Sequence, residues 1–291
     1  FTRKGRCYWL KCYEIPEGDK NFKGRAIQNM LNIEPDDSVN AMLRLRGLND
    51  EEFVNSHYVV FATKNGTIKK TCLEAYSRPR TNGVNAINIV EGDEVVDVRL
   101  TNGKNEIILA NRNGRAVRFD ENTVRAMGRV STGVRGMQLD GDDDQVVGMI
   151  IVNDAETETV MVVSENGYGK RSQVEDYRKT NRGGKGVKTF SITEKTGRLV
   201  AIKNVTDDND LMIINKSGIA IRLAVSDCRV MGRATQGVRL INLSKKNDVI
   251  ASVCKVMSSE LEAKLADDNA STESEATEAT EANEAKPENE K

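Results

Sequence analysis

Residues 107–119 read IILANRNGRAVRF, and this stretch decides the fold. An apolar run ends in an Asn/Gly turn at Gly114, and an alternating run follows. This pattern is the strongest short-range sequence signal for a β-hairpin. The turn recurs as TRKGR, TKNGT, SENGY and NKSGI, around Gly5, Gly66, Gly167 and Gly218. The sequence therefore predicts five repeats, each built on one hairpin.

A second glycine follows each turn after 17 or 19 residues, at Gly24, Gly83, Gly133, Gly186 and Gly237. Further strand-like stretches, such as GVRGMQL and VVGMIIV, bring each repeat to about four strands in about 50 residues, which is typical of a propeller blade. We therefore expect an all-β, propeller-like β-pinwheel of four-stranded blades. Five repeats are present, and because Phe1 falls inside an expected strand, we expect the chain to be a fragment of a longer protein.

The chain divides by charge into a body, residues 1–257, and a tail, residues 258–291. The tail holds eleven acidic residues and three lysines, a net charge of −8, which leaves +7 on the body. The Glu, Ala and Thr composition of the tail predicts disorder, with a short helix over 257–268 at its start. Two roles stay open for the tail, a solubilising segment or a polyanion that competes for a basic face on the body.

Several classes of function find little support in the composition. Aromatic residues make up 4% of the chain, too few for a platform that stacks single-stranded bases. No apolar stretch or signal peptide is present, so we expect a soluble, cytoplasmic protein. His57 is the only histidine and is expected to be structural, and the five scattered cysteines are expected to be reduced. The acidic loop at Asp140, Asp142, Asp143 and Asp144 lacks the ligand spacing of a calcium loop. We expect neither catalysis nor a metal site in this fragment.

Cationic residues follow the repeat in two sets. The strand set comes just after the hairpin turn and consists of Lys69, Lys70, Arg115, Arg118, Lys170, Arg171 and Arg222. The loop set precedes the second glycine and consists of Arg78, Arg80, Arg125, Arg129, Arg178, Arg182, Arg229 and Arg233. Equivalent charges on successive blades should form one stripe around the rim, which suits a polyanion with regularly spaced phosphates. The alternative is that these charges only protect strand edges from aggregation.

One segment concentrates this chemistry. Thr180 to Gly186 reads TNRGGKG, and Arg178 and Lys179 precede it. Gly183, Gly184 and Gly186 allow backbone N–H groups to approach phosphate oxygens, while Arg182 and Lys185 supply charge-assisted contacts. No recognition helix is expected, so contact with the nucleic-acid backbone is the predicted mode of binding.

The repeats resemble those of a known family. RFDENTVRAMGRVSTGVRGM, NGYGKRSQVEDYRKTNRGGKGVK and GRATQGVRLI look like the C-terminal domain of DNA gyrase A, over about residues 1–257. The resemblance implies a six-bladed β-pinwheel whose blades exchange strands and whose basic perimeter wraps duplex DNA to support negative supercoiling. TNRGGKG is similar to the family's signature heptapeptide. In the family that heptapeptide belongs to the first blade, whereas here it lies in the fourth repeat.

The resemblance also implies partners for the longer protein. These are double-stranded DNA, the gyrase A N-terminal region and the gyrase B protein in an A2B2 assembly, with ATP and Mg as cofactors of the parent enzyme, a type IIA topoisomerase. It implies no cofactor, no catalytic residue and no membrane contact for this fragment. Two alternatives stay open, the C-terminal domain of the gyrase A counterpart in topoisomerase IV and a propeller scaffold that binds protein partners.

Overall fold

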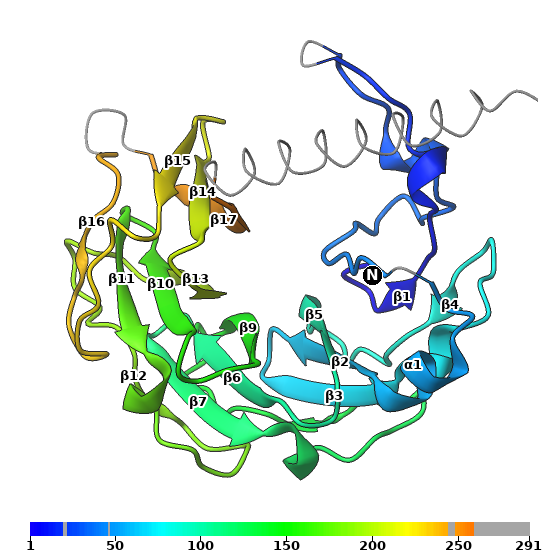
Figure 1. Ribbon diagram of the computed structural model, residues 1–291, viewed down its shortest axis with the longest axis horizontal. Coiled ribbons are helices and arrows are strands. Elements are labelled where there is room, and N and C mark those ends of the chain that lie inside the picture. Colours follow the sequence, from blue (N-terminus) through cyan, green and yellow to red (C-terminus); the bar gives the residue numbers. More distant parts are fainter. Residues whose placement is uncertain (20–21, 46, 244–247, 259–291) are drawn as a thin grey trace, which may run out of the picture.

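The computed structural model describes residues 1–19, 22–45, 47–243 and 248–258. Its small antiparallel sheets stand around a common centre in an open arc (Figure 1). The predicted helix over 257–268 and the predicted disorder of the tail lie almost wholly outside the described residues. The all-β propeller-like fold is confirmed.

Each of the later repeats contributes a hairpin, an inner strand and a short crossing strand. The hairpins are β2 (Tyr58–Thr63) with β3 (Thr67–Cys72), β6 (Glu106–Asn111) with β7 (Arg115–Asp120), β10 (Thr159–Ser164) with β11 (Tyr168–Gln173), and β14 (Asn209–Asn215) with β15 (Ala220–Ala224). The inner strands are β5 (Val95–Thr101), β9 (Val146–Val152), β13 (Leu199–Val205) and β17 (Ile250–Met257). The crossing strands are β4 (Val84–Asn85), β8 (Val134–Arg135), β12 (Val187–Lys188) and β16 (Val238–Arg239).

Neighbouring repeats exchange these crossing strands. The sheet orders are β5-β2-β3-β8, β9-β6-β7-β12 and β13-β10-β11-β16, so each of these blades takes its outermost strand from the following repeat. The described part of the last blade is β17-β14-β15, and that of the first repeat pairs β1 (Arg6–Cys7) with β4. The strand exchange that the family resemblance implied is thus present.

The two repeated glycines allow this exchange. Gly114, at φ +78°, lies under the next repeat's chain, and a Cβ there would come within 2.7 Å of the Phe190 carbonyl oxygen. Gly186, at φ +73°, lies where the crossing strand reaches the preceding blade, and a Cβ there would come within 2.2 Å of the Ala116 carbonyl oxygen. A side chain at either glycine would hold the exchanged strand away from its blade.

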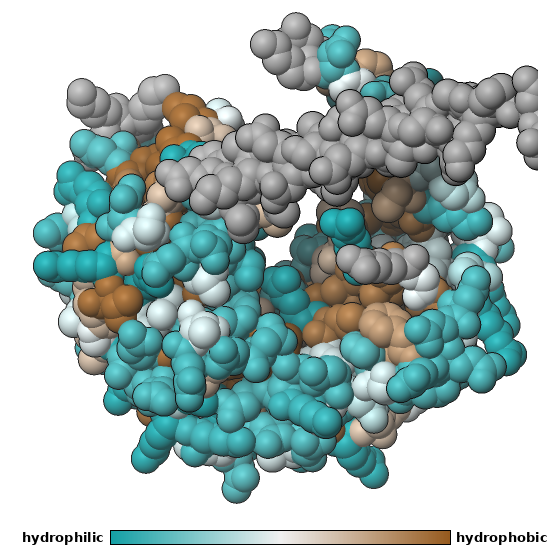
Figure 2. All heavy atoms as spheres, viewed as in Figure 1, coloured by the Kyte–Doolittle hydropathy of each residue, from teal (hydrophilic) through white to brown (hydrophobic). Residues whose placement is uncertain are grey.

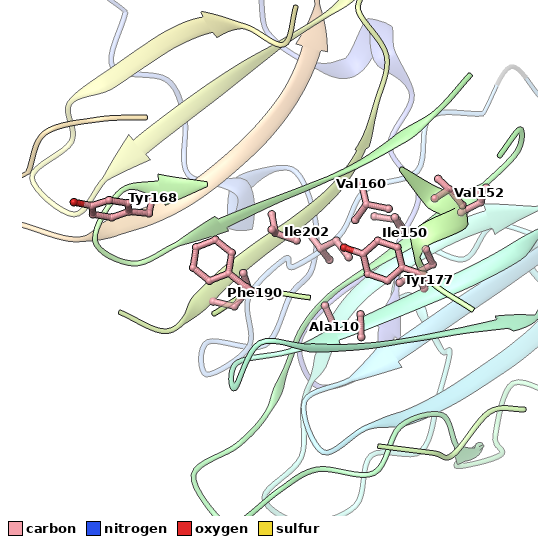
Figure 3. Packing of buried hydrophobic residues seen from close by; sticks show 13 residues of the cluster. Ala110, Ile150, Val152, Val160, Tyr168, Tyr177, Phe190 and Ile202 are labelled. Carbon is pink, nitrogen blue, oxygen red and sulfur yellow. The ribbon is translucent and has the colours of Figure 1, made fainter. Parts of the chain in front are cut away.

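The core is a series of clusters between adjacent blades. Figure 3 shows Tyr177 and Phe190 of one repeat close to Ala110 and Ile150 of the repeat before it. The Tyr177 hydroxyl bonds to Thr189 Oγ1 at 2.5 Å, so this large buried side chain leaves no polar atom unsatisfied. Blade-to-blade packing of this kind makes each repeat depend on its neighbours.

The link between the first two repeats contains α1 (Glu51–Ser56), which the sequence analysis did not predict. Asp50 caps it by accepting a hydrogen bond from the Phe53 backbone N–H at 3.0 Å. His57 ends the helix, with its Nδ1 3.0 Å from the Phe53 carbonyl oxygen and its ring 4.1 Å from the Phe53 ring. His57 therefore has a structural role, as predicted.

Short 3-10 turns occupy the remaining bends. They are η1 (Cys12–Glu14), η2 (Ile27–Asn29), η3 (Leu73–Tyr76), η4 (Glu121–Thr123) and η5 (Val174–Asp176). The last three follow β3, β7 and β11, and each begins the loop that carries the chain to the preceding blade.

Candidate nucleic-acid interface

Much of the strand set is buried, and the prediction that it would face the rim is wrong for Lys69, Lys70, Lys170 and Arg171. The Lys69 ammonium donates to the carbonyl oxygens of Ala86 and Arg129, and the Lys170 ammonium donates to that of Gly232 at 2.8 Å. Burial lowers the pKa of Lys69 to about 8 and that of Lys170 to about 7. Both side chains hold loops of the following repeat instead of facing solvent.

The fourth residue of each of these strands forms a related set of internal contacts. Lys70 pairs with Glu121 at 2.8 Å, and its ammonium lies 4.2 Å from the Tyr58 ring centroid. Arg118 donates to the carbonyl oxygens of Val174 and Tyr177.

Arg171 and Arg222 occupy the same register position. Arg171 donates to the carbonyl oxygens of Val225 and Cys228 and pairs with Asp207 at 2.7 Å. Arg222 pairs with Asp210 at 2.7 Å, and Arg115, near the turn, lies 3.4 Å from Asp140. A core does need charge at these positions, because the cations satisfy carbonyl groups where the chain crosses between blades.

The loop set is on the surface. Arg78, Arg80, Arg125, Arg178 and Arg229 are exposed, and Arg129, Arg182 and Arg233 are half-buried. Three equivalent backbone bonds fix the loops, from the N–H groups of Met127, Thr180 and Met231 to the carbonyl oxygens of Lys70, Arg118 and Arg171, each at 2.8 Å. The loops therefore sit at one position on three successive blades, beside the outermost strands.

The five exposed arginines of the loop set form no ion pair with any carboxylate in the described parts of the chain. Lys179 differs, because it pairs with Glu106 at 3.0 Å and Asp120 at 3.2 Å. The hydrogen bond to Glu106 raises the pKa of Lys179. Free arginines on exposed loops are the groups best placed to meet phosphates.

The Thr180 to Gly186 loop lies on the preceding repeat. Arg182 donates from Nε to the Thr123 carbonyl oxygen at 2.9 Å and from Nη1 to that of Arg135 at 3.0 Å. The backbone N–H of Gly183 donates to the Gly136 carbonyl oxygen at 2.7 Å. Arg233, at the equivalent position, donates to the Lys188 carbonyl oxygen at 2.6 Å. The guanidinium predicted to contact phosphate thus has a positioning task as well.

Lys185 extends from the same loop beside a pocket of about 260 Å³. Arg118, Arg178, Thr180, Asn181 and Gly184 are among the residues that line it. The Lys185 ammonium pairs with Asp140 at 2.8 Å, and this hydrogen bond lowers the pKa of the Asp140 carboxyl. A polyanion that binds here competes with Asp140 for Lys185.

The acidic loop has contacts of its own. Buried Asp144 accepts hydrogen bonds from Asn111 Nδ2 and from the backbone N–H groups of Asn113 and Asp140. Asp143 pairs with Arg198 at 2.5 Å. Nowhere in the described residues do three His, Cys, Asp or Glu side chains come together as a metal site.

The sequence analysis missed a third set of cations, on the crossing strands. Arg135, Lys188 and Arg239 each stand two residues after the second glycine and are exposed. Arg239 is held by its Nη2, which donates to the Tyr168 hydroxyl at 2.9 Å. The recurring Gly-Val-Arg or Gly-Val-Lys tripeptide was the available signal. We call these three residues the outer-strand set.

Together the loop set and the outer-strand set put cations on the periphery of the arc. Figure 1 shows β4, β12 and β16 at its outside edge, and Figure 2 shows hydrophilic residues over much of the perimeter in the same view. The same spacing recurs from blade to blade because both sets stand at fixed distances from the second glycine.

Comparison with known proteins agrees with this architecture. The family described as DNA gyrase C-terminal domain, beta-propeller, matches residues 1–46, 57–102, 105–153, 158–206 and 209–254. The chain belongs to the DNA gyrase C-terminal domain family. The five matches correspond to the five repeats that the glycine spacing predicted.

Curated relatives include the DNA gyrase A proteins of Staphylococcus aureus strains MRSA252 and NCTC 8325. Each is 44% identical over 256 residues, which are 88% of this chain and 28% of the relative. The chain thus spans somewhat more than a quarter of the length of these relatives.

Solved structures resemble the same part of the chain. The C-terminal domain of a DNA topoisomerase IV has a TM-score of 0.78 and 27% identity, with 88% of this chain and 78% of that chain covered. A DNA gyrase A C-terminal domain has a TM-score of 0.75 and 24% identity, with 88% and 80% covered. No helix in the described residues is long and apolar enough to cross a membrane.

Proposed function

We propose that this gyrase C-terminal domain binds duplex DNA without strong sequence preference and bends it around its perimeter. The observation that carries the proposal is the recurrence of exposed, unpaired arginines at one position on successive blades, Arg125, Arg178 and Arg229. The outer-strand set adds cations to the same edge. Phosphate contacts of this kind set the position and path of DNA but do not read its sequence.

The energy of bending sets the number of contacts required. Turning a duplex through about half a circle over ~40 bp costs on the order of 10 kcal/mol. About 6 to 10 phosphate contacts would offset this cost and would lower affinity by roughly 10³ to 10⁵ between 50 and 200 mM salt. The exposed members of the loop and outer-strand sets, Arg78, Arg80, Arg125, Arg178, Arg229, Arg135, Lys188 and Arg239, reach that range.

In the longer protein we propose that this domain acts beside the gyrase A N-terminal region and the gyrase B protein, in an ATP- and Mg-dependent topoisomerase of the bacterial cytoplasm. The domain would hold the DNA segment, and the chemistry would belong to the other parts. The 44% identity to gyrase A proteins supports this assignment. The similarity to a topoisomerase IV domain keeps that enzyme as a second candidate, and the sign and size of trapped supercoils would separate the two.

The test is a salt titration of affinity by fluorescence anisotropy, with 20-bp and 60-bp duplexes. A wrap predicts tighter binding and a steeper salt slope for the longer duplex. Arg125→Gln/Arg178→Gln/Arg229→Gln should lower the slope by about 3, roughly one unit for each lost phosphate contact.

The matched control is Lys64→Gln/Lys195→Gln/Lys216→Gln, which removes three exposed or half-buried lysines near the starts of the inner strands. It should leave the slope within about one unit of the parent value. Equal slopes for both duplexes, or equal losses in both variants, would contradict perimeter binding.

A further inference from the structure

The inner strands line the centre of the arc in a common register. Figure 1 shows β5, β9, β13 and β17 along its inner edge, and we call this region the hub. The antiparallel pairs Val60 with Arg99, Met161 with Lys203 and Met212 with Cys254 put Arg99, Lys203 and Cys254 at equivalent positions. All three lie in the C-terminal halves of their strands, and Lys255 follows Cys254.

Three of these hub residues form a cationic cluster, Arg99, Lys203 and Lys255. Burial lowers the pKa of Lys203, and Arg99 lowers it further. Burial also lowers the pKa of Lys255, and both Arg99 and Lys203 add to that effect. The three charges therefore repel one another across the hub, although they come from three different blades.

The nearby carboxylates are already engaged. Asp97 accepts hydrogen bonds from the backbone N–H groups of Val98 and Met149 as well as from Arg99 Nη2. Glu158 accepts from the Asn153 backbone and from Asn204 Nδ2. Arg99 Nε is buried and has no hydrogen-bond partner in the structure. The cluster thus has more positive charge and more donors than its own acids satisfy.

An anion of matching charge follows in the same chain. β17 ends at Met257, two residues after Lys255, and residues 260–290 hold eleven acidic side chains. A segment joined so closely to its site has an effective concentration in the millimolar range. We propose that Arg99, Lys203 and Lys255 form an oxyanion site at the hub, and that carboxylates of the acidic segment 260–290 occupy it.

This site is separate from the perimeter, so its test needs no DNA. Cys254 stands in the hub cluster, and its thiol is exposed. We expect bound carboxylates to cover Cys254 and to disfavour its thiolate, which is the reactive form. The measurement is the rate of Cys254 alkylation by iodoacetamide, read by peptide mapping so that Cys12 and Cys72 do not interfere.

The full chain is compared with a chain of the same length whose eleven tail acids are replaced by glutamine or asparagine. At 20 mM salt, Cys254 should react several-fold more slowly in the unchanged chain, and the difference should disappear near 1 M salt because the contacts are screened. Arg99→Gln/Lys203→Gln/Lys255→Gln should abolish the protection. The control Lys64→Gln/Lys195→Gln/Lys216→Gln, which removes three charges from the opposite end of the inner strands, should retain it.

Equal alkylation rates with acidic and neutral tails would overturn the proposal. So would protection that survives in the Arg99, Lys203 and Lys255 variant, because the tail would then act without the cluster. Protection by added inorganic phosphate in the neutral-tail chain, with none from the acidic tail, would assign the site to a free anion and overturn the proposed occupant. None of these results depends on whether the perimeter bends DNA.

Discussion

Lys170 shows how a single cation serves the fold at a cost that depends on pH. Its side chain is buried, its ammonium donates to the Gly232 carbonyl oxygen, and burial lowers its pKa from 10.5 to about 7. In the unfolded chain Lys170 titrates near the ordinary value. Between about pH 7 and 10.5 the unfolded chain therefore binds more protons than the folded chain, and the Lys170 contribution to stability rises with pH.

The first prediction follows from that sign. Between pH 7 and 9.5 the free energy of unfolding should rise by about 1 to 3 kcal/mol more in the parent chain than in Lys170→Met, because only the parent retains this titration. Urea denaturation at the two pH values, followed by circular dichroism, measures the difference. A pH dependence that is identical in the two proteins would show that Lys170 keeps an ordinary pKa in the fold.

A second prediction concerns Gly186, where the crossing strand reaches the Ala116 carbonyl group. Gly186→Ala should lower the free energy of unfolding by about 1 to 3 kcal/mol, because its Cβ would clash and its φ is positive. Gly184→Ala, in the same loop, meets no atom closer than 4.0 Å and should cost less than about 1 kcal/mol. Thermal denaturation of both variants checks this, and equal melting temperatures would refute the explanation of the repeated glycine.

The exchanged strand is the element that joins the blades, and the buried cations of the strand set hold it. Arg171 is nearly enclosed, with a side-chain exposure of 7%, and binds carbonyl oxygens at both ends of the 225–228 turn. The turn begins the loop that leads to β16, the outermost strand of the blade that contains Arg171. The same residue therefore helps to position the strand that its own blade borrows.

The third prediction tests this role. Arg171→Ala should destabilise the chain by about 2 to 4 kcal/mol, because the buried carbonyl groups lose a charged donor. Arg178→Ala removes an exposed arginine of the same repeat and should cost within about 0.5 kcal/mol. Hydrogen exchange should also show faster opening of β16 in the Arg171 variant. Protection of β16 equal to that of the parent would remove Arg171 from strand exchange.

The sequence could predict the repeat, the hairpins and the four-stranded blades, because turn glycines and alternating residues are local signals. It could not separate Lys170, which is buried, from Arg178, which is exposed, because both are cations at positions that repeat. Their difference arises from the exchanged strand, a long-range contact that covers one and leaves the other in solvent. The outer-strand set was missed although Val134–Arg135, Val187–Lys188 and Val238–Arg239 share a pattern, because two-residue strands give almost no periodic signal.

The whole molecule places its two kinds of cation in different surroundings. Exposed arginines and lysines follow the outer edge, where they fit the spacing of a duplex backbone, while Arg99, Lys203 and Lys255 face the centre. The body carries a net charge of +7, and the acidic segment nearly cancels it. The perimeter and the hub can therefore be tested independently, one with DNA and the other with the tail alone.

The most direct test of the central claim is a topological one. The chain is incubated with relaxed closed-circular plasmid, a type I topoisomerase is added, and the linking difference is read on a two-dimensional chloroquine gel after deproteinisation. A perimeter that wraps DNA with positive handedness predicts a trapped positive linking difference. The variant Arg125→Gln/Arg178→Gln/Arg229→Gln should lose most of it. An unchanged linking number at saturating protein would contradict wrapping.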